Sequence, residues 1–181
     1  MFLTDIGIGL LVAIVVCKIG GVDPSAQYLC TGIFGSLLPD IDMLIYRLQG
    51  GKMDKWAHKH RDISHYPLIT VPILAGVAYY FYGIWHCVIL AIAMSCHYRH
   101  DIPEPGWGIR LFYPFSKKYI AYRSRDGIEA PQWYAWTAKE QDEIANEYGN
   151  DKWVKDWTFW VPSLAVLTVG IISAFFWIYS Q

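Results

Sequence analysis

The last apolar segment of the sequence restricts the possible fold more than any other feature. Trp157–Ser180 reads WTFWVPSLAVLTVGIISAFFWIYS and contains no charged side chain. An α-helix needs about 20 apolar residues to cross the hydrocarbon layer, because lipid offers the backbone no hydrogen-bond partner. Aromatic residues at both ends of the segment suit the two headgroup layers. The segment therefore predicts a transmembrane helix, and the chain is predicted to be an integral membrane protein.

Earlier apolar stretches predict an all-α bundle with about five membrane helices. The four further stretches are Ile6–Ile19, Ala26–Leu38, Pro67–Tyr82 and Ile84–Cys96. The second is short and stops at Pro39, which disfavours helix in the residue before it, so we expect a short or re-entrant span. Gly7 and Gly9 lie inside the first stretch and predict close helix packing. With 181 residues, the chain has room for one membrane-embedded domain, residues 1–181.

Two polar loops, Met43–His65 and Asp101–Asp156, carry every Lys and Arg except Lys18 and Arg99. The predicted hairpin between the loops, which turns at Gly83, places both on one side of the membrane. The positive-inside tendency makes this side cytoplasmic, together with the N-terminus. A net charge of −1 gives no indication of a nucleic-acid partner.

The second loop is predicted to be a cytoplasmic insertion, residues 101–156. A capping-box pattern at Thr137–Glu140 predicts a surface helix that runs to Tyr148. The preceding segment, Trp107–Trp136, is rich in aromatic and basic residues, which suit the membrane interface. Two interpretations stay open for it, an ordered loop anchored beside the bilayer and a surface that contacts a lipid substrate.

Three short polar clusters lie at the cytoplasmic ends of predicted membrane helices. In the first, Pro39 favours a turn that would bring Asp40 and Asp42 together, although a solvated helix end is the favoured interpretation of this pair taken alone. The second contains three histidines, and imidazole is the usual nitrogen ligand of zinc. The histidines of that cluster are His58, His60 and His65.

The third cluster is His97-Tyr-Arg-His100-Asp101. His97 and Asp101 are four residues apart on a predicted helix, so both side chains reach one face and can bind one metal ion. His100 lies near that face and is a candidate to orient a ligand or bind substrate. The three clusters together supply the mixed nitrogen and oxygen ligands of a catalytic zinc, manganese or iron centre.

These motifs resemble those of the YdjM-like family of bacterial and archaeal membrane-bound metal-dependent hydrolases. The matching segments are LLPDID at Leu37–Asp42, HRDISH at His60–His65, HYRHD at His97–Asp101, and LFYPFS at Leu111–Ser116. The resemblance implies a set of metal ligands, namely Asp40, Asp42, His60, His65, His97 and Asp101. Arg61 matches the family arginine.

The sequence also departs from the family pattern. Met43 stands where the family usually has a histidine after the Asp pair, Asp62 replaces a glycine, and Tyr66 replaces a serine. The family's histidine near the N-terminus has no counterpart, and Asp5 is the nearest polar residue. These differences bear on how many metal ions the site holds and on whether the activity is kept.

The family is in turn distantly similar to the zinc-dependent phospholipase C and single-strand nuclease enzymes. The resemblance implies hydrolysis of a phosphoester with a divalent metal, zinc before manganese or iron. The resemblance implies catalytic roles for Asp40, which holds the metal, and Arg61, which neutralises phosphate charge. His100, from its position near the same helix face, is the third catalytic candidate. The membrane location favours a lipid or lipid-linked phosphate at the cytoplasmic face. The alternative is a non-catalytic metal-binding scaffold or an ion transporter, although ligand candidates at helix ends favour chemistry near the surface over a transport path.

Overall fold

The computed structural model describes residues 2–23, 25–52, 61, 63–103, 107–125, 128–148 and 157–179. It divides into two compact units. The first, which we call the bundle, comprises Met1–Pro39, Val71–His97 and Asp156–Gln181. The second, which we call the hairpin unit, comprises Asp40–Thr70 and Tyr98–Lys155. Each unit is described by itself.

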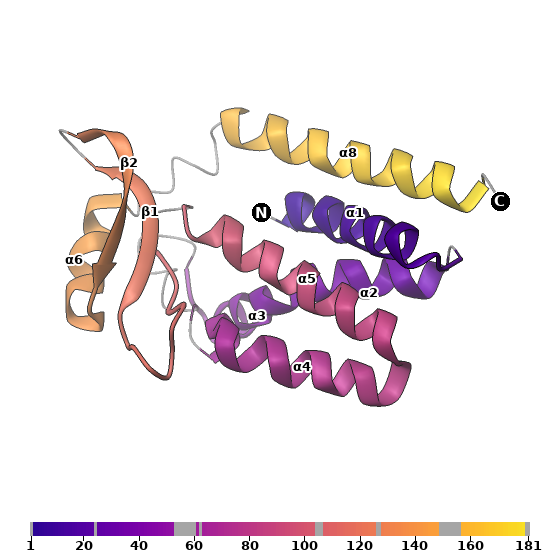
Figure 1. Cartoon of the computed structure of the whole chain (residues 1–181). Coiled ribbons are helices and arrows are strands. Elements are labelled where there is room, and N and C mark those ends of the chain that lie inside the picture. Colours follow the sequence, from indigo (N-terminus) through magenta and orange to yellow (C-terminus); the bar gives the residue numbers. More distant parts are fainter. Residues whose placement is uncertain are drawn as a thin grey trace. The chain divides into compact units, whose positions relative to one another are not determined.

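The bundle is built from five helices that run alongside one another (Figure 1). They are α1 (Phe2–Gly20), α2 (Ala26–Leu37), most of α4 (Pro67–Tyr82), most of α5 (Ile84–Asp101) and α8 (Trp157–Tyr179). Although α1 and α8 lie at opposite ends of the sequence, they pack against each other, and α1 also packs against α2. Gly83, with a φ of 87°, forms the predicted tight turn between α4 and α5.

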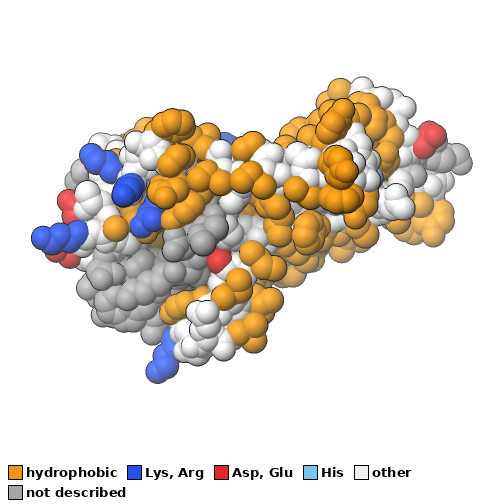
Figure 2. Space-filling model, turned by 90° about the horizontal axis from the view of Figure 1, so that it is seen from below, with side chains coloured by type: hydrophobic (Ala, Val, Ile, Leu, Met, Phe, Trp, Pro, Cys, Tyr) orange, Lys and Arg blue, Asp and Glu red, His pale blue; other side chains and the backbone are white. Residues whose placement is uncertain are grey.

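Apolar residues lie both inside the bundle and on its surface. Its core is made by α1 together with residues of α2, α5 and α8, including Leu10, Ile14, Leu29, Ile89 and Trp177. Large apolar side chains on α4 and α8 are exposed. Figure 2, which views the molecule from the side on which α4 lies, shows hydrophobic side chains over much of this face. The only charged side chains among the described residues of the bundle are Asp5, Lys18 and Asp23. Such a surface fits contact with lipid.

Three helical runs are long and apolar enough to cross a membrane, namely Phe2–Gly20, Ala26–Leu48 and Trp160–Tyr179. The second run is longer than the sequence predicted. After α2, a single 3-10 turn, η1 (Leu38–Asp40), leads directly into α3 (Ile41–Leu48). Pro39 lies in the first turn of this new helical segment. Backbone N–H groups in a first turn have no partner within the helix, so the missing N–H of proline costs no hydrogen bond there. The expected break at Pro39 is therefore one turn of tighter helix.

Glycines allow the helices of the bundle to approach closely, as Gly7 and Gly9 predicted. A Cβ atom added at Gly9 would collide with the backbone carbonyl of Gly32 on α2. A Cβ atom at Gly7 would lie 2.6 Å from the carbonyl oxygen of Val166 on α8. Both neighbours are backbone, which has no side-chain freedom to move aside. The small residues are thus required by the contacts of α1 with both helices.

Gly9→Ala is expected to lower the stability of the bundle by about 1–3 kcal/mol, because the new methyl group overpacks the contact between α1 and α2. Gly76→Ala is the matched control, since Gly76 lies on α4 and nothing lies within 4 Å of an added Cβ there. The midpoint of thermal unfolding in detergent measures both variants. Equal midpoints for the two variants would show that the contact between α1 and α2 tolerates a side chain.

The hairpin unit contains the one sheet seen in the described residues, which the all-α prediction missed. Strand β1 (Tyr119–Arg125) pairs antiparallel with β2 (Ile128–Trp136), and Tyr119 lies opposite Trp136. Tyr119 and Ala121 alternate with more exposed neighbours, and the aromatic residues of the segment favour strands. Their inward face, with Trp136, packs against Ile144 of α6 (Ala138–Tyr148).

Helix α6 begins where the capping-box pattern predicted. The backbone N–H of Thr137 donates to Glu140 Oε2 at 2.7 Å, and the Thr137 hydroxyl donates to the same oxygen at 2.8 Å. The two hydrogen bonds lower the pKa of Glu140 below its usual value. Gln141, the residue after Glu140, accepts from the Trp136 indole N–H and donates to the backbone carbonyl of Trp107 at 3.2 Å. The start of α6 is thereby tied to β2 and to the segment before β1.

Candidate metal centre

His65 lies at the centre of a buried cluster of carboxylates in the hairpin unit. It ends a short 3-10 helix, η3 (Ile63–His65), and its side chain is 1% exposed. Its Nδ1 atom is 2.9 Å from Asp42 Oδ2. On the other edge of the ring, Nε2 is 3.1 Å from Asp101 Oδ2 and 3.9 Å from Asp40 Oδ1. Both ring nitrogens therefore face carboxylates.

The local structure around Pro39 and Ser64 places these side chains. Asp40 ends the 3-10 turn η1 and Asp42 lies in the first turn of α3, so the two carboxylates reach different edges of the same imidazole. The Ser64 hydroxyl donates to Asp42 Oδ2. The Tyr98 hydroxyl, from the last turns of α5, donates to the Ser64 carbonyl at 2.6 Å. The η3 helix is thus tied to both α3 and the end of α5.

Arg61 is buried against Asp101. The guanidinium donates from Nη2 to Asp101 Oδ1 at 2.8 Å and from Nη1 to the Asp101 carbonyl oxygen at 3.3 Å. It also lies 5.6 Å from the centre of the Trp107 ring, and the Arg61 residue is 3% exposed. The family resemblance implies that Arg61 neutralises phosphate charge, whereas in the structure its guanidinium contacts the carboxylate that faces His65. Because Oδ1 is held by Arg61, Oδ2 is the oxygen directed at the imidazole.

His97 has a carboxylate partner that sequence analysis did not assign. Within the bundle, His97 Nδ1 lies 3.1 Å from Asp5 Oδ1 on α1, and both side chains are fully buried. The signal for Asp5 was available in the sequence, since a carboxylate inside an apolar helix is costly and usually has a function. His97 is also one helical turn before Asp101 on α5, so the helix itself places these two side chains on one face.

Both histidines share one arrangement, in which Nδ1 lies beside a carboxylate. The carboxylate is Asp42 for His65 and Asp5 for His97. Histidines that bind metals through Nε2 usually donate the Nδ1 proton to a carboxylate or carbonyl, which fixes the tautomer and the ring orientation. The pattern therefore leaves Nε2 as the candidate ligand atom of each ring.

The distances at His65 fit a shared metal ion. Nitrogen and oxygen ligands lie about 2.0–2.2 Å from zinc, so two ligands of one tetrahedral ion stand about 3.4 Å apart. The separations from His65 Nε2, 3.1 Å to Asp101 Oδ2 and 3.9 Å to Asp40 Oδ1, lie on either side of this value. One nitrogen and two carboxylate oxygens make a donor set that zinc, manganese and iron accept.

Comparison with known proteins assigns the chain to a family. The chain matches the model of the YdjM inner membrane protein family over residues 1–178. It belongs to that family. The predicted resemblance to this family is thereby confirmed, and the apolar helices of the bundle are those of an integral membrane protein. No curated protein and no solved structure matches the chain.

The charge state of His65 in this YdjM family member follows from its neighbours. Burial lowers the pKa of His65, but the hydrogen bonds and charges of Asp101 and Asp42 outweigh burial and raise the pKa above its ordinary value. A protonated His65 therefore stabilises the metal-free fold at low pH, and this contribution is lost as the pH rises through the raised pKa. A metal at Nε2 must displace that proton, so metal binding weakens as the pH falls.

The two remaining histidines of the predicted site in this YdjM family member are His60 and His100. His60 lies outside the residues that the structure describes, as does the neighbouring Asp62. His100, on the last turn of α5, has a side chain that is 18% exposed, and its Nε2 lies 3.9 Å from Asp101 Oδ1. In the hairpin unit, His100 is therefore the more accessible histidine beside the cluster, since His65 is almost fully covered.

Proposed function

We propose that this protein is a membrane-bound metal-dependent hydrolase, a phosphoesterase that acts on a lipid or lipid-linked phosphate at the cytoplasmic face. The observation that supports it most is the arrangement of three aspartates around His65, with Asp42 on Nδ1 and both Asp40 and Asp101 on the Nε2 side. A buried imidazole among carboxylates resembles the ligand shell of a divalent metal. Burial of so many ionisable groups costs folding free energy, which a bound metal would offset.

Within this proposal, His65 Nε2, Asp40 and Asp101 are metal ligands. His97, which precedes Asp101 by one turn of α5, and His60 stay predicted ligands. Asp42 and Asp5 contact the Nδ1 atoms and so orient the rings instead of binding the metal directly. The family resemblance implied that Asp42 is a metal ligand. We propose instead that Asp42 orients His65 through Nδ1.

The chemistry divides between the metal and the side chains. When bound, zinc, manganese or iron supplies a hydroxide near neutral pH and polarises a phosphoryl oxygen. Arg61 holds Oδ1 of Asp101 and so keeps Oδ2 turned toward the ligand site, which makes Arg61 a positioning residue. We assign to His100, whose side chain is 18% exposed, the exchange of a proton with the leaving group or a hydrogen bond to substrate.

We propose five membrane crossings, by α1, the α2–α3 run, α4, α5 and α8, with the N-terminus and both polar loops cytoplasmic. The charge distribution of the loops supports this topology. In a cysteine-free background, cysteines placed at Gln49 and Ser116 should both react with a membrane-impermeant maleimide only after the cytoplasmic side is opened. Reaction of either cysteine in intact spheroplasts would exclude this orientation.

In lipid vesicles, the purified protein is expected to release phosphate from phosphatidic acid or from a polyprenyl phosphate only when zinc or manganese is present. His65→Asn should reduce kcat by about a thousandfold or more, because the variant loses a metal ligand and the nucleophile with it. Ser95→Ala, on α5, is the control, since the Ser95 hydroxyl donates to the Ala91 carbonyl oxygen at 2.8 Å and none of the assigned ligands that the structure describes contacts it. Turnover by His65→Asn at the wild-type rate would remove His65 from the active site.

The alternative is a non-catalytic scaffold that binds the metal for stability. Arg61 is buried and contacts Asp101, so it covers this side of the cluster, which favours the alternative. A structural metal site is closed in this way and has no open coordination position for water. The scaffold predicts stoichiometric metal and no phosphate release from any lipid phosphate tested. The hydrolase predicts both metal and turnover.

A further inference from the structure

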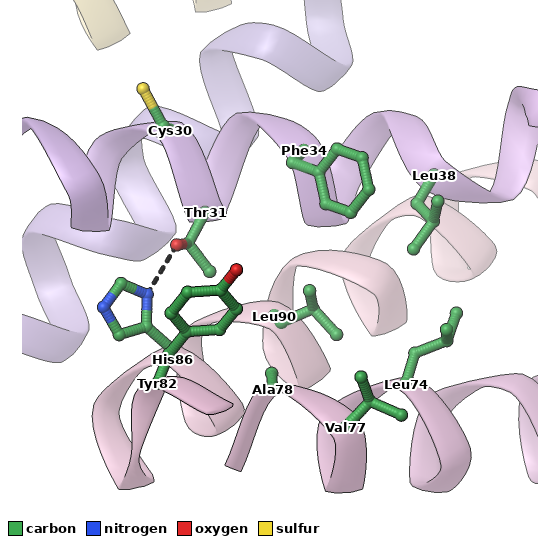
Figure 3. Close-up of a pocket in the computed structure, with 10 residues that line it drawn as sticks. All are labelled: Cys30, Thr31, Phe34, Leu38, Leu74, Val77, Ala78, Tyr82, His86 and Leu90. Atoms are coloured by element: carbon green, nitrogen blue, oxygen red, sulfur yellow. Dashed lines mark hydrogen bonds between the residues drawn. The ribbon is translucent and has the colours of Figure 1, made fainter. Parts of the chain in front are cut away.

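A pocket in the bundle lies away from the carboxylate cluster and has no place in the proposed hydrolysis. It opens between α2, α4 and α5 and has a volume of about 430 Å³ (Figure 3). His86, at one end of it, precedes His97 by 11 residues on α5, which is about 16 Å along a helix. Small-molecule sites have volumes of about 300–1,000 Å³. The pocket is therefore large enough for a ligand and separate from the residues assigned to metal.

One end of the pocket is polar. His86 Nδ1 and Thr31 Oγ1 are 2.7 Å apart, and Figure 3 shows this pair beside the Tyr82 ring. A second pocket of about 280 Å³ shares Cys30, Thr31, Tyr82 and His86 with the first and adds Gln27. The polar end therefore continues into a small chamber lined by an amide, a hydroxyl and an imidazole. It lies at the turn that joins α4 to α5.

The other end is apolar. Phe34, Leu38, Leu74 and Leu90 line it, and Figure 3 places Leu38 and Leu74 at the end remote from His86. From Thr31 to Leu38 is seven residues of helical chain, which is about 10 Å. Phe34 is 56% exposed and Val77 is 48% exposed, so the pocket opens sideways on the apolar surface of the bundle.

Hydrogen bonding at the polar end identifies which atom can receive a ligand. The Thr31 hydroxyl has one proton, and it donates that proton to the Gln27 carbonyl oxygen at 2.8 Å. His86 must then donate from Nδ1 to Thr31 Oγ1. In a neutral imidazole with the proton on Nδ1, Nε2 is an acceptor. The polar end is therefore suited to a group that donates a hydrogen bond.

We propose that this pocket binds one phospholipid whose headgroup donates hydrogen bonds, with one of its two acyl chains along α2 and α4 and its polar part at Thr31 and His86. The order of the lining residues, polar at the helix turn and aliphatic farther along the helices, matches the order of groups in a lipid. The pocket opens on the apolar surface of the bundle, which is the surface that would contact membrane lipid. A water-soluble ligand would leave most of its polar groups unpaired against Phe34, Leu38 and Leu74.

The full-length protein in bilayer discs tests this proposal with two phosphatidylethanolamine probes. One carries a diazirine near the acyl carbonyl and the other carries it near the chain end. After illumination, mass spectrometry should locate the first label near Thr31 and Tyr82, and the second near Leu38 and Leu74. The same label positions for both probes, or labels spread evenly over exposed residues of α8, would overturn the proposal.

Two comparisons sharpen the test. Val77→Trp fills the opening at an exposed position and should reduce labelling at least fivefold, whereas Ile171→Trp, at a 53% exposed position on α8, should leave it unchanged. Phosphatidylcholine probes lack the N–H donors and should label less than phosphatidylethanolamine in wild type, with the difference lost in His86→Phe. Equal labelling by the two lipids in wild type would overturn the headgroup assignment. None of these readouts depends on metal or on hydrolysis.

Discussion

Wild-type protein purified in detergent is expected to contain at least about one equivalent of zinc, manganese or iron, and Asp40→Asn is expected to contain almost none. Asp40 is 5% exposed and lies on the Nε2 side of His65, so the neutral amide replaces a charged ligand without changing the size of the side chain. Asp42→Asn should still bind the metal, but with an affinity about 10- to 100-fold lower, because it removes only the carboxylate that contacts His65 Nδ1. Elemental analysis after gel filtration measures all three proteins.

Asp23→Asn is the matched control for the metal measurement, since Asp23 is exposed at the turn after α1. It should retain the wild-type metal content. Metal content should also fall as the buffer is made more acidic, because the raised pKa of His65 makes the proton a stronger competitor for Nε2. A wild type that binds no metal even after resupply, or an Asp40→Asn variant that binds as much as wild type, would contradict the assignment of the site.

The helices of the bundle could be predicted from the sequence, because membrane spans are set by long uncharged runs. The predicted stretch Pro67–Tyr82 is also the observed α4, and Trp157–Ser180 differs from α8 by one residue. The hairpin of β1 and β2 could not be predicted in the same way. Its aromatic residues suit strands and the membrane interface alike, and only their tertiary partner, Ile144 of α6, distinguishes the two.

The candidate site could be predicted in composition but not in geometry. The motifs named Asp40, His65 and Asp101, which the structure brings together. They did not show that Asp42 would lie on the Nδ1 edge of the ring, since this depends on the 3-10 turn at Pro39. The pairing of Asp5 with His97 joins residues 92 positions apart, and no local pattern connects them.

Removal of the Asp101 side chain is expected to damage the fold as well as the metal site. Arg61 and Asp101 have side chains that are 1% and 0% exposed, and their charged atoms are 2.8 Å apart. Asp101→Ala leaves the guanidinium buried without its partner, which typically destabilises a protein by about 3–5 kcal/mol. Unfolding of metal-free wild type and variant by denaturant in detergent should show this loss.

The double variant Arg61→Met/Asp101→Leu separates the two roles of Asp101. It replaces the ion pair with apolar side chains of similar length, and such replacements of buried pairs are often neutral or stabilising. We therefore expect the double variant to regain most of the stability that Asp101→Ala loses while it still binds no metal. If Asp101→Ala were as stable as metal-free wild type, the ion pair would have no structural role. If the double variant bound metal normally, Asp101 would not be a ligand, and the cluster at His65 would need only Asp40 to hold the ion.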